Sequence, residues 1–180
     1  MNALNNFLFI ALPYIALFVF LIGSIYRYKS KKFTYSSLSS QFLETRKLYW
    51  GSLPFHWGIV FLFFGHLIAF AIPQSVLLWN QQPVRLAILE ITAFVFGIMT
   101  LAGLINLFYR RITNPRIRIV TNYMDIILEI LLLAQIFLGL WVAYGFKWGS
   151  SWFAIVLTPY LYSIFTLNPQ IDSIVMLPVV

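Results

Sequence analysis

The sequence contains no cysteine, and this absence excludes disulfide bonds, thiolate-bound zinc and iron–sulfur clusters held by this chain. Charged residues are also scarce: they make up 9% of the 180 residues, whereas 61% of the residues are hydrophobic. Because a typical water-soluble domain has about 25% charged residues, these proportions predict an integral membrane protein.

Acidic residues are fewer than basic ones, with 5 Asp and Glu against 12 Lys and Arg, which gives a net charge of +7. A basic excess is also typical of proteins that bind nucleic acid. Here, however, the basic residues flank long apolar stretches, as the topology signals of membrane proteins do. We therefore expect membrane lipid, and no nucleic acid, around this chain.

The long apolar stretches predict an all-α integral membrane protein, a transmembrane helix bundle with four full spans. An apolar helix needs about 20 residues to cross the hydrocarbon core of a bilayer. The stretches of about this length are Phe7–Ile25, Leu53–Ile72, Leu86–Phe108 and Met124–Tyr144.

Three further segments lie outside these spans. Gln74–Pro83 is expected to be a short external loop. Trp152–Phe165 is interrupted by Pro159 and is short for a span, so we expect an external segment at the membrane interface. The apolar end, Ser173–Val180, is interpreted as the start of a fifth span, which makes residues 1–180 a single transmembrane domain that is incomplete at its C-terminus.

The distribution of basic residues predicts the orientation. Ten of the twelve Lys and Arg residues follow the first and third predicted spans, and only Arg85 and Lys147 lie in the alternate connections. Because Lys and Arg are enriched in cytoplasmic loops, this asymmetry predicts an N-terminus outside the membrane. The His56 end of the second span is then cytoplasmic, and His66 lies toward the outer face.

The only two histidines, His56 and His66, lie ten residues apart in the second predicted span. On a helix, ten residues rise about 15 Å and bring the two side chains within about 80° of each other. The two imidazoles are therefore too far apart to share one metal ion. Either each ligates a haem iron at its own depth, or each hydrogen-bonds to a neighbouring helix. Gly58 and Gly65 would admit a flat ring or another helix equally well.

Several motifs along the chain carry a resemblance to a known family: Gly23-Ser24, Arg27-Tyr28, Ser39-Ser40-Gln41, Phe55-His56-Trp57-Gly58-Ile59, Gly65-His66, Pro73, Asn114-Pro115-Arg116-Ile117-Arg118 and Asp125. With these motifs the chain resembles the gamma subunit of respiratory nitrate reductase, a membrane cytochrome b that anchors a molybdenum enzyme. The histidine pair with its flanking glycines is the most specific part of the resemblance.

The resemblance implies five spans and two b haems. It implies that His56 ligates the iron of the haem near the cytoplasmic side, and that His66, beside Gly65, ligates the iron of the haem near the outer side. The family's opposite ligands are two histidines on the fifth span, so this chain up to Val180 would supply one ligand for each haem.

The resemblance also implies a function. The family oxidises a membrane quinol near the outer face and passes electrons to an iron–sulfur beta subunit and a molybdenum alpha subunit, which reduces nitrate. The membrane would be the cytoplasmic membrane of a bacterium or archaeon. Arg85 lies where the family has a cationic quinol-binding residue; an ordinary interfacial anchor is the alternative. Glu90 is expected to accept or relay the quinol proton, or instead to pair with Arg85 or lie near a haem propionate.

Other features admit simpler interpretations. Asp125 and Glu129, at the start of the fourth predicted span, complement the helix dipole. The arginines around Asn114 are first of all topology signals. Two rival functions stay open: a sister cytochrome b of a heterodisulfide-reductase-like complex, and a cofactor-free transporter or assembly subunit in which both histidines are structural.

Overall fold

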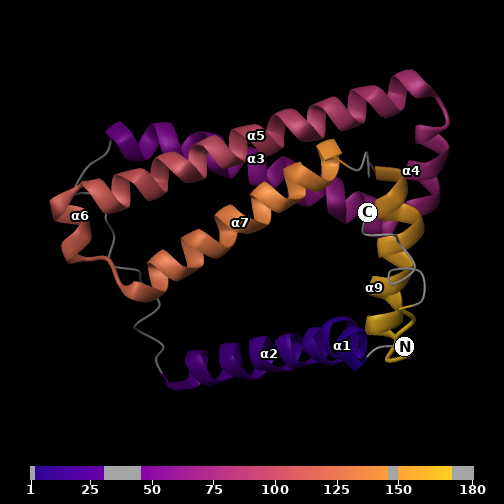
Figure 1. Cartoon of the computed structure of the whole chain (residues 1–180), viewed down its shortest axis with the longest axis horizontal. Helices are drawn as coiled ribbons and strands as arrows, with labels where there is room; N and C mark the ends of the chain where they lie inside the picture. Colours follow the sequence, from indigo (N-terminus) through magenta and orange to yellow (C-terminus); the bar gives the residue numbers. More distant parts are fainter. Residues whose placement is uncertain (1–2, 31–45, 146–149, 172–180) are drawn as a thin grey trace. The chain divides into compact units, whose positions relative to one another are not determined.

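The computed structural model describes residues 3–30, 46–145 and 150–171, except for the side chains of residues 46, 47 and 150. All regular elements in these ranges are helices, which confirms the all-α prediction (Figure 1). The chain divides into two compact units. Unit 1 comprises residues 1–37 and 154–180, and unit 2 comprises residues 38–153. The predicted start of a fifth span, Ser173–Val180, lies outside the described residues.

Within the described ranges, four helices are long and apolar enough to cross a membrane, as predicted. Three of them extend past the predicted span at both ends, whereas the second begins earlier than predicted and ends one residue before Ile72. Helical hydrogen bonding can continue past the apolar residues that define the hydrocarbon core. The four helical segments are Ala3–Ser30, Leu48–Ala71, Pro83–Thr113 and Tyr123–Gly145.

In unit 1, the first of these segments contains a π-helical turn. It is built from α1 (Ala3–Asn6), η1 (Phe7–Ala11) and α2 (Leu12–Ser30). The π-helical turn ends two residues before Pro13. Proline has no N–H to donate to the carbonyl four residues earlier, and its ring pushes against that carbonyl, so a widened turn accommodates it.

A second π-helical turn precedes a second proline in the same way. After α8 (Ser150–Trp152), η4 (Phe153–Leu157) ends two residues before Pro159, which lies in α9 (Thr158–Phe165). The helix from Phe153 to Phe165 is apolar but too short for a span, in agreement with the length expected for this segment.

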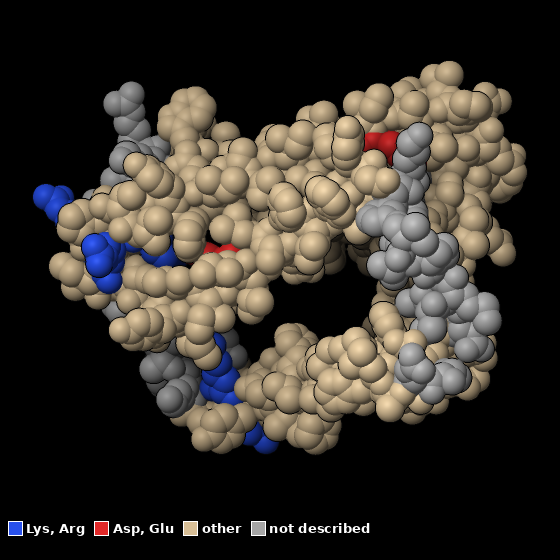
Figure 2. Space-filling view, in the orientation of Figure 1, with Lys and Arg blue, Asp and Glu red and all other residues tan. Residues whose placement is uncertain are grey.

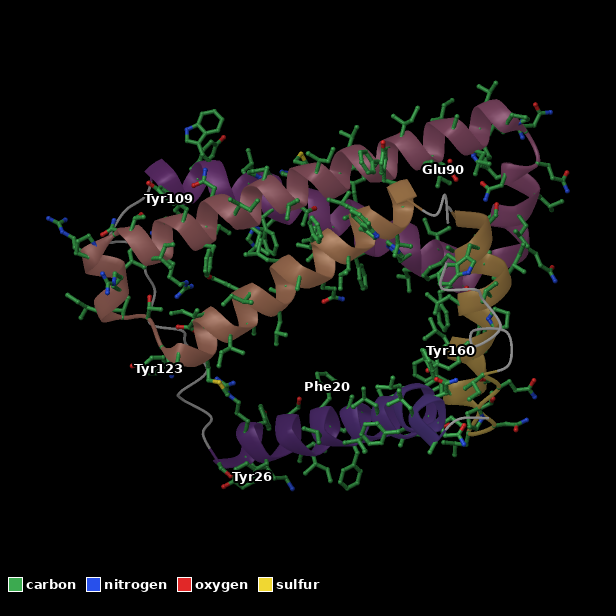
Figure 3. The ribbon with its side chains drawn as sticks, in the orientation of Figure 1. Phe20, Tyr26, Glu90, Tyr109, Tyr123 and Tyr160 are labelled. Atoms are coloured by element: carbon green, nitrogen blue, oxygen red, sulfur yellow. The ribbon has the colours of Figure 1, made fainter. Side chains whose placement is uncertain are left out.

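Two tyrosine hydroxyls join the helices of unit 1, and each helix supplies one of them. The Tyr160 hydroxyl donates to the Phe9 carbonyl at 2.7 Å, and the Tyr14 hydroxyl donates to the Ile164 carbonyl at 3.0 Å. Pro13 has no N–H to donate to the Phe9 carbonyl, and the Tyr160 hydroxyl does donate to it. Tyr160 lies on α9 (Figure 3) and is buried with Ile164.

Unit 2 contains the other three long helices. In chain order its helices before α8 are α3 (Arg46–Ala71), α4 (Pro73–Asn80), α5 (Pro83–Thr113), α6 (Pro115–Ile119) and α7 (Tyr123–Gly145). Helix α3 packs along α5, and α7 packs on α5 as well (Figure 1). Helix α5 therefore lies between the other two long helices in the packing of this unit.

The prediction that Gln74–Pro83 forms a loop is wrong, because most of this segment forms α4. Pro73 and Pro83 are each the first residue of a helix. Proline favours this position, since its fixed φ suits the first turn and its missing N–H would have no partner there. The two prolines therefore start helices, and only a two-residue turn separates α4 from α5.

Three glycines lie at seven-residue intervals on one face of α3 and show where α5 approaches closely and where it does not. A Cβ on Gly58 would overlap the Thr100 hydroxyl and lie 2.8 Å from the Phe96 carbonyl oxygen. A Cβ on Gly51 would lie 2.9 Å from the Leu107 side chain, whereas one on Gly65 would meet no atom within 4 Å. Gly58 is thus a helix-packing glycine, and Gly65 lies beside open space.

We expect Gly58→Ala to weaken the contact between α3 and α5. The methyl group must displace the Thr100 side chain or the α5 backbone, and such overpacking costs about 1–3 kcal/mol. The measurement is the midpoint of thermal unfolding in one detergent. The matched control is Gly139→Ala on α7, where the methyl group meets no atom within 4 Å. Equal midpoints for the two variants would contradict the packing role of Gly58.

Candidate functional site

His56 lies on α3 with its ring held by its own helix. Its Nδ1 atom is 2.7 Å from the Ser52 carbonyl oxygen and 3.0 Å from the Ser52 hydroxyl. A carbonyl oxygen has no proton to donate, so a contact of this length requires a proton on Nδ1. In the neutral imidazole, Nε2 then carries a free lone pair.

His66, ten residues further along α3, has the same arrangement. Its Nδ1 atom is 2.7 Å from the Leu62 carbonyl oxygen, four residues earlier. Within the described residues, neither Nε2 atom has a hydrogen bond, and both histidines are exposed. The hydrogen bonds of the two imidazoles therefore go to α3 itself, and not to a neighbouring helix.

A phenyl ring lies against each imidazole. The Phe55 ring is 5.3 Å from the His56 ring, with 85° between the ring planes. The Phe153 ring is 5.2 Å from the His66 ring, with 73° between the planes. Edge-to-face contacts of this kind restrict how a ring can rotate. Each histidine is thus oriented by one carbonyl group and one aromatic ring.

These features suit a histidine that ligates a metal through Nε2. Ligating histidines usually donate the other ring N–H to a carbonyl or carboxylate oxygen, which fixes the tautomer and the ring orientation. Within the described residues, no group of three or more His, Cys, Asp or Glu side chains could hold a metal ion by itself. Each histidine on its own could therefore supply one nitrogen to a metal centre such as a haem iron, and the two would serve separate centres.

The other predicted site residues lie toward the α4 end of unit 2. The Arg85 guanidinium carbon is 5.0 Å from the centre of the Trp79 ring, a cation–π contact between α5 and α4. Glu90 lies five residues further along α5 (Figure 3) and is exposed. Five residues turn a helix by about 140°, so the two side chains leave on different sides. Among the described residues Glu90 forms no ion pair, with Arg85 or any other residue.

At the opposite end of unit 2, an ion-pair cluster joins α5 to α7. Arg111 Nε donates to Glu129 at 2.7 Å, and Arg111 Nη1 lies 3.4 Å from Asp125. Asp125 also accepts from the Asn122 backbone N–H at 3.0 Å, at the start of α7. Figure 2 shows red carboxylate atoms next to blue basic atoms at this end.

The interpretation of Asp125 and Glu129 from the sequence, as acids that complement the helix dipole, did not include their ion pairs with Arg111. The available signal was the spacing of the acids, because residues four apart share one face of a helix. That face could receive an arginine from the end of the preceding helix. Glu129 is 8% exposed, and its second oxygen has no hydrogen-bond partner within the described residues, so its charge depends on Arg111.

Comparisons with known proteins agree on one family. A family model described as the nitrate reductase gamma subunit matches residues 5–180. The chain is 38% identical over 138 residues to the respiratory nitrate reductase 2 gamma chain of Escherichia coli, which covers 76% of this chain and 61% of that relative. It is 35% identical over 130 residues to the nitrate reductase gamma chain of Bacillus subtilis, with 71% and 58% covered.

A third relative gives a similar result. The chain is 36% identical over 141 residues to the respiratory nitrate reductase 1 gamma chain of Escherichia coli, which covers 78% of this chain and 63% of the relative. The chain therefore spans about three fifths of the length of the curated relatives that it matches.

We expect Arg111→Ala to destabilise the protein by up to about 3 kcal/mol, because Glu129 would keep a buried carboxylate without its partner. Thermal unfolding in detergent measures the loss. The control Arg118→Ala, which removes an exposed arginine, should leave the midpoint nearly unchanged. Adding Glu129→Leu to Arg111→Met should recover stability, and a double variant no more stable than Arg111→Ala would refute this account.

Proposed function

The chain belongs to the nitrate reductase gamma subunit family, and from this membership we propose that it is the di-haem cytochrome b subunit of a membrane-bound nitrate reductase. The observation that carries the proposal is the shared state of the two histidines on α3. Each has its Nδ1 proton engaged by a helix carbonyl, which leaves Nε2 for a metal.

In this proposal, His56 and His66 would each hold one b-type haem through Nε2, and Gly65 leaves room beside His66. When bound, each haem supplies a centre that takes up and releases one electron at a time. The protein's own task is to fix the two imidazoles about 15 Å apart along α3, at two membrane depths.

The proposed orientation has the N-terminus outside, which puts His66 and the α4 end near the outer face. Quinol would be oxidised there, and electrons would leave at the Arg-rich end, which faces the cytoplasm. The partners there would be an iron–sulfur beta subunit and a molybdenum alpha subunit. We place the complex in the cytoplasmic membrane of a bacterium or archaeon. The basic cluster at the α6 end supports this orientation, because such clusters favour the cytoplasmic side (Figure 2).

Arg85 and Glu90 would serve the quinol in different ways. Arg85 is held over Trp79 at the start of α5, where its N–H groups can donate to a quinol oxygen. Glu90 is exposed and is not neutralised by Arg85, so its carboxylate can accept a proton. The absence of an ion pair between them supports the relay that the sequence suggested for Glu90.

The first test is the reduced-minus-oxidised optical spectrum of the full-length protein in membranes. We expect a b-type signal with two components, one of which disappears in His56→Ala and the other in His66→Ala, because each variant removes one axial nitrogen. A wild-type protein that is well expressed with adequate haem supply and still shows no haem band would refute the cytochrome and favour a cofactor-free membrane subunit.

The second test concerns the proton. Glu90→Gln is expected to slow quinol oxidation by about 100-fold, because an amide cannot accept the proton, whereas Glu90→Asp should keep a measurable rate. The rate of haem reduction by added quinol in membranes measures the effect. The Glu90→Gln protein must retain both spectral components, which controls for folding. An unchanged rate in Glu90→Gln would rule out the relay.

A further inference from the structure

The two histidines differ in where their phenyl rings come from. Phe55 is the sequence neighbour of His56 and lies on the same helix. Phe153, by contrast, is the last residue of unit 2 and lies in the segment that follows α7 in the chain. Among the described residues, the contacts that orient His56 come from α3, whereas the orientation of His66 also depends on the segment that begins at Ser150.

This segment is fixed to the rest of unit 2 close to Phe153. The Asn80 amide N–H, at the end of α4, donates to the Ser151 hydroxyl at 3.1 Å. Asn80 is 9% exposed, so this hydrogen bond is shielded from competing polar groups. Two residues later, Phe153 contacts the His66 ring. Helix α4, which follows α3 directly, thus holds the segment that carries Phe153.

A helix carbonyl alone fixes the position of Nδ1 but leaves the ring some freedom to swing about the hydrogen bond. A phenyl ring packed edge-to-face against the imidazole restricts that remaining motion. The direction of the Nε2 lone pair follows from the ring plane, so both contacts together determine where an iron can bind. His66, which is exposed, has this second contact through Phe153.

We propose that Phe153 is a positioning residue for His66, and that the Asn80–Ser151 hydrogen bond keeps it in place. The inference rests on the proposed function, since the group that His66 positions would be the outer haem. Through Phe153, the segment after α7 sets the properties of that haem and leaves the haem on His56 unaffected. The residues that tune the two haems are therefore separate.

The test is a redox titration of the difference spectrum for the full-length protein in membranes. Phe153→Leu is expected to shift the midpoint potential and lower the amplitude of the component that is absent in His66→Ala. The component absent in His56→Ala should stay unchanged, which also shows that the variant folds. Phe55→Leu is the matched control and should have the opposite selectivity, because its ring lies against the His56 ring.

Two further variants separate the ring contact from a general packing effect. Phe153→Tyr keeps an aromatic ring and should retain the wild-type potential. Ser151→Ala removes the acceptor for Asn80 and should shift the same component as Phe153→Leu, by a smaller amount. A Phe153→Leu protein in which both components shift, or in which neither shifts, would overturn the inference.

These outcomes are distinct from failure of the proposed function. A wild-type protein without haem overturns the proposed function, and this inference with it. A wild-type protein with two components, each lost in one histidine variant, supports the proposed function. In that case an unchanged Phe153→Leu protein overturns the positioning role alone.

Discussion

The hydrogen bond from a histidine Nδ1 to the carbonyl four residues earlier is the interaction on which the rest of this protein depends. A carbonyl oxygen has two lone pairs, so the Ser52 and Leu62 carbonyls can accept an imidazole proton and a helix N–H together. No break in α3 is needed. One regular helix therefore carries two imidazoles in the same tautomer, each with its Nε2 lone pair directed away from the helix backbone.

The glycines of α3 determine which side of the helix remains available. Gly51 and Gly58 bring α5 into close contact, while Gly65, on the same face, lies beside open space. Two packed helices lie about 8–10 Å apart, whereas the eight residues of α4 that join them span about 12 Å. Helix α4 is therefore long enough to hold the joined ends of α3 and α5 apart, and the open space beside Gly65 lies in the half of α3 that leads to α4. Helix α4 also anchors Ser151 through Asn80.

The sequence predicted the features that depend on composition and local pattern. The four spans followed from the length of the apolar stretches. The placement of His56 and His66 on one helix followed from their position in one of these stretches. The orientation of the chain and the roles of Arg85, Glu90 and Gly65 stay predictions. Helix α4 was missed because prolines and glutamines suggest a loop, although Pro73 equally favours the first position of a helix. The Arg111 cluster and the Phe153 contact join residues far apart in the chain, and no periodic signal in one sequence reports such pairs.

Because the two phenyl rings come from different parts of the chain, sequence changes outside α3 would affect His66 more directly than His56. A ring supplied by the neighbouring residue moves with its histidine, as Phe55 does with His56 on α3. A ring supplied by a later segment responds to whatever moves that segment. Phe153 is the first residue of a π-helical turn that ends two residues before Pro159. In the proposed cytochrome, the potential at His66 can therefore be adjusted through residues 150–153, while the ring beside His56 belongs to α3 itself.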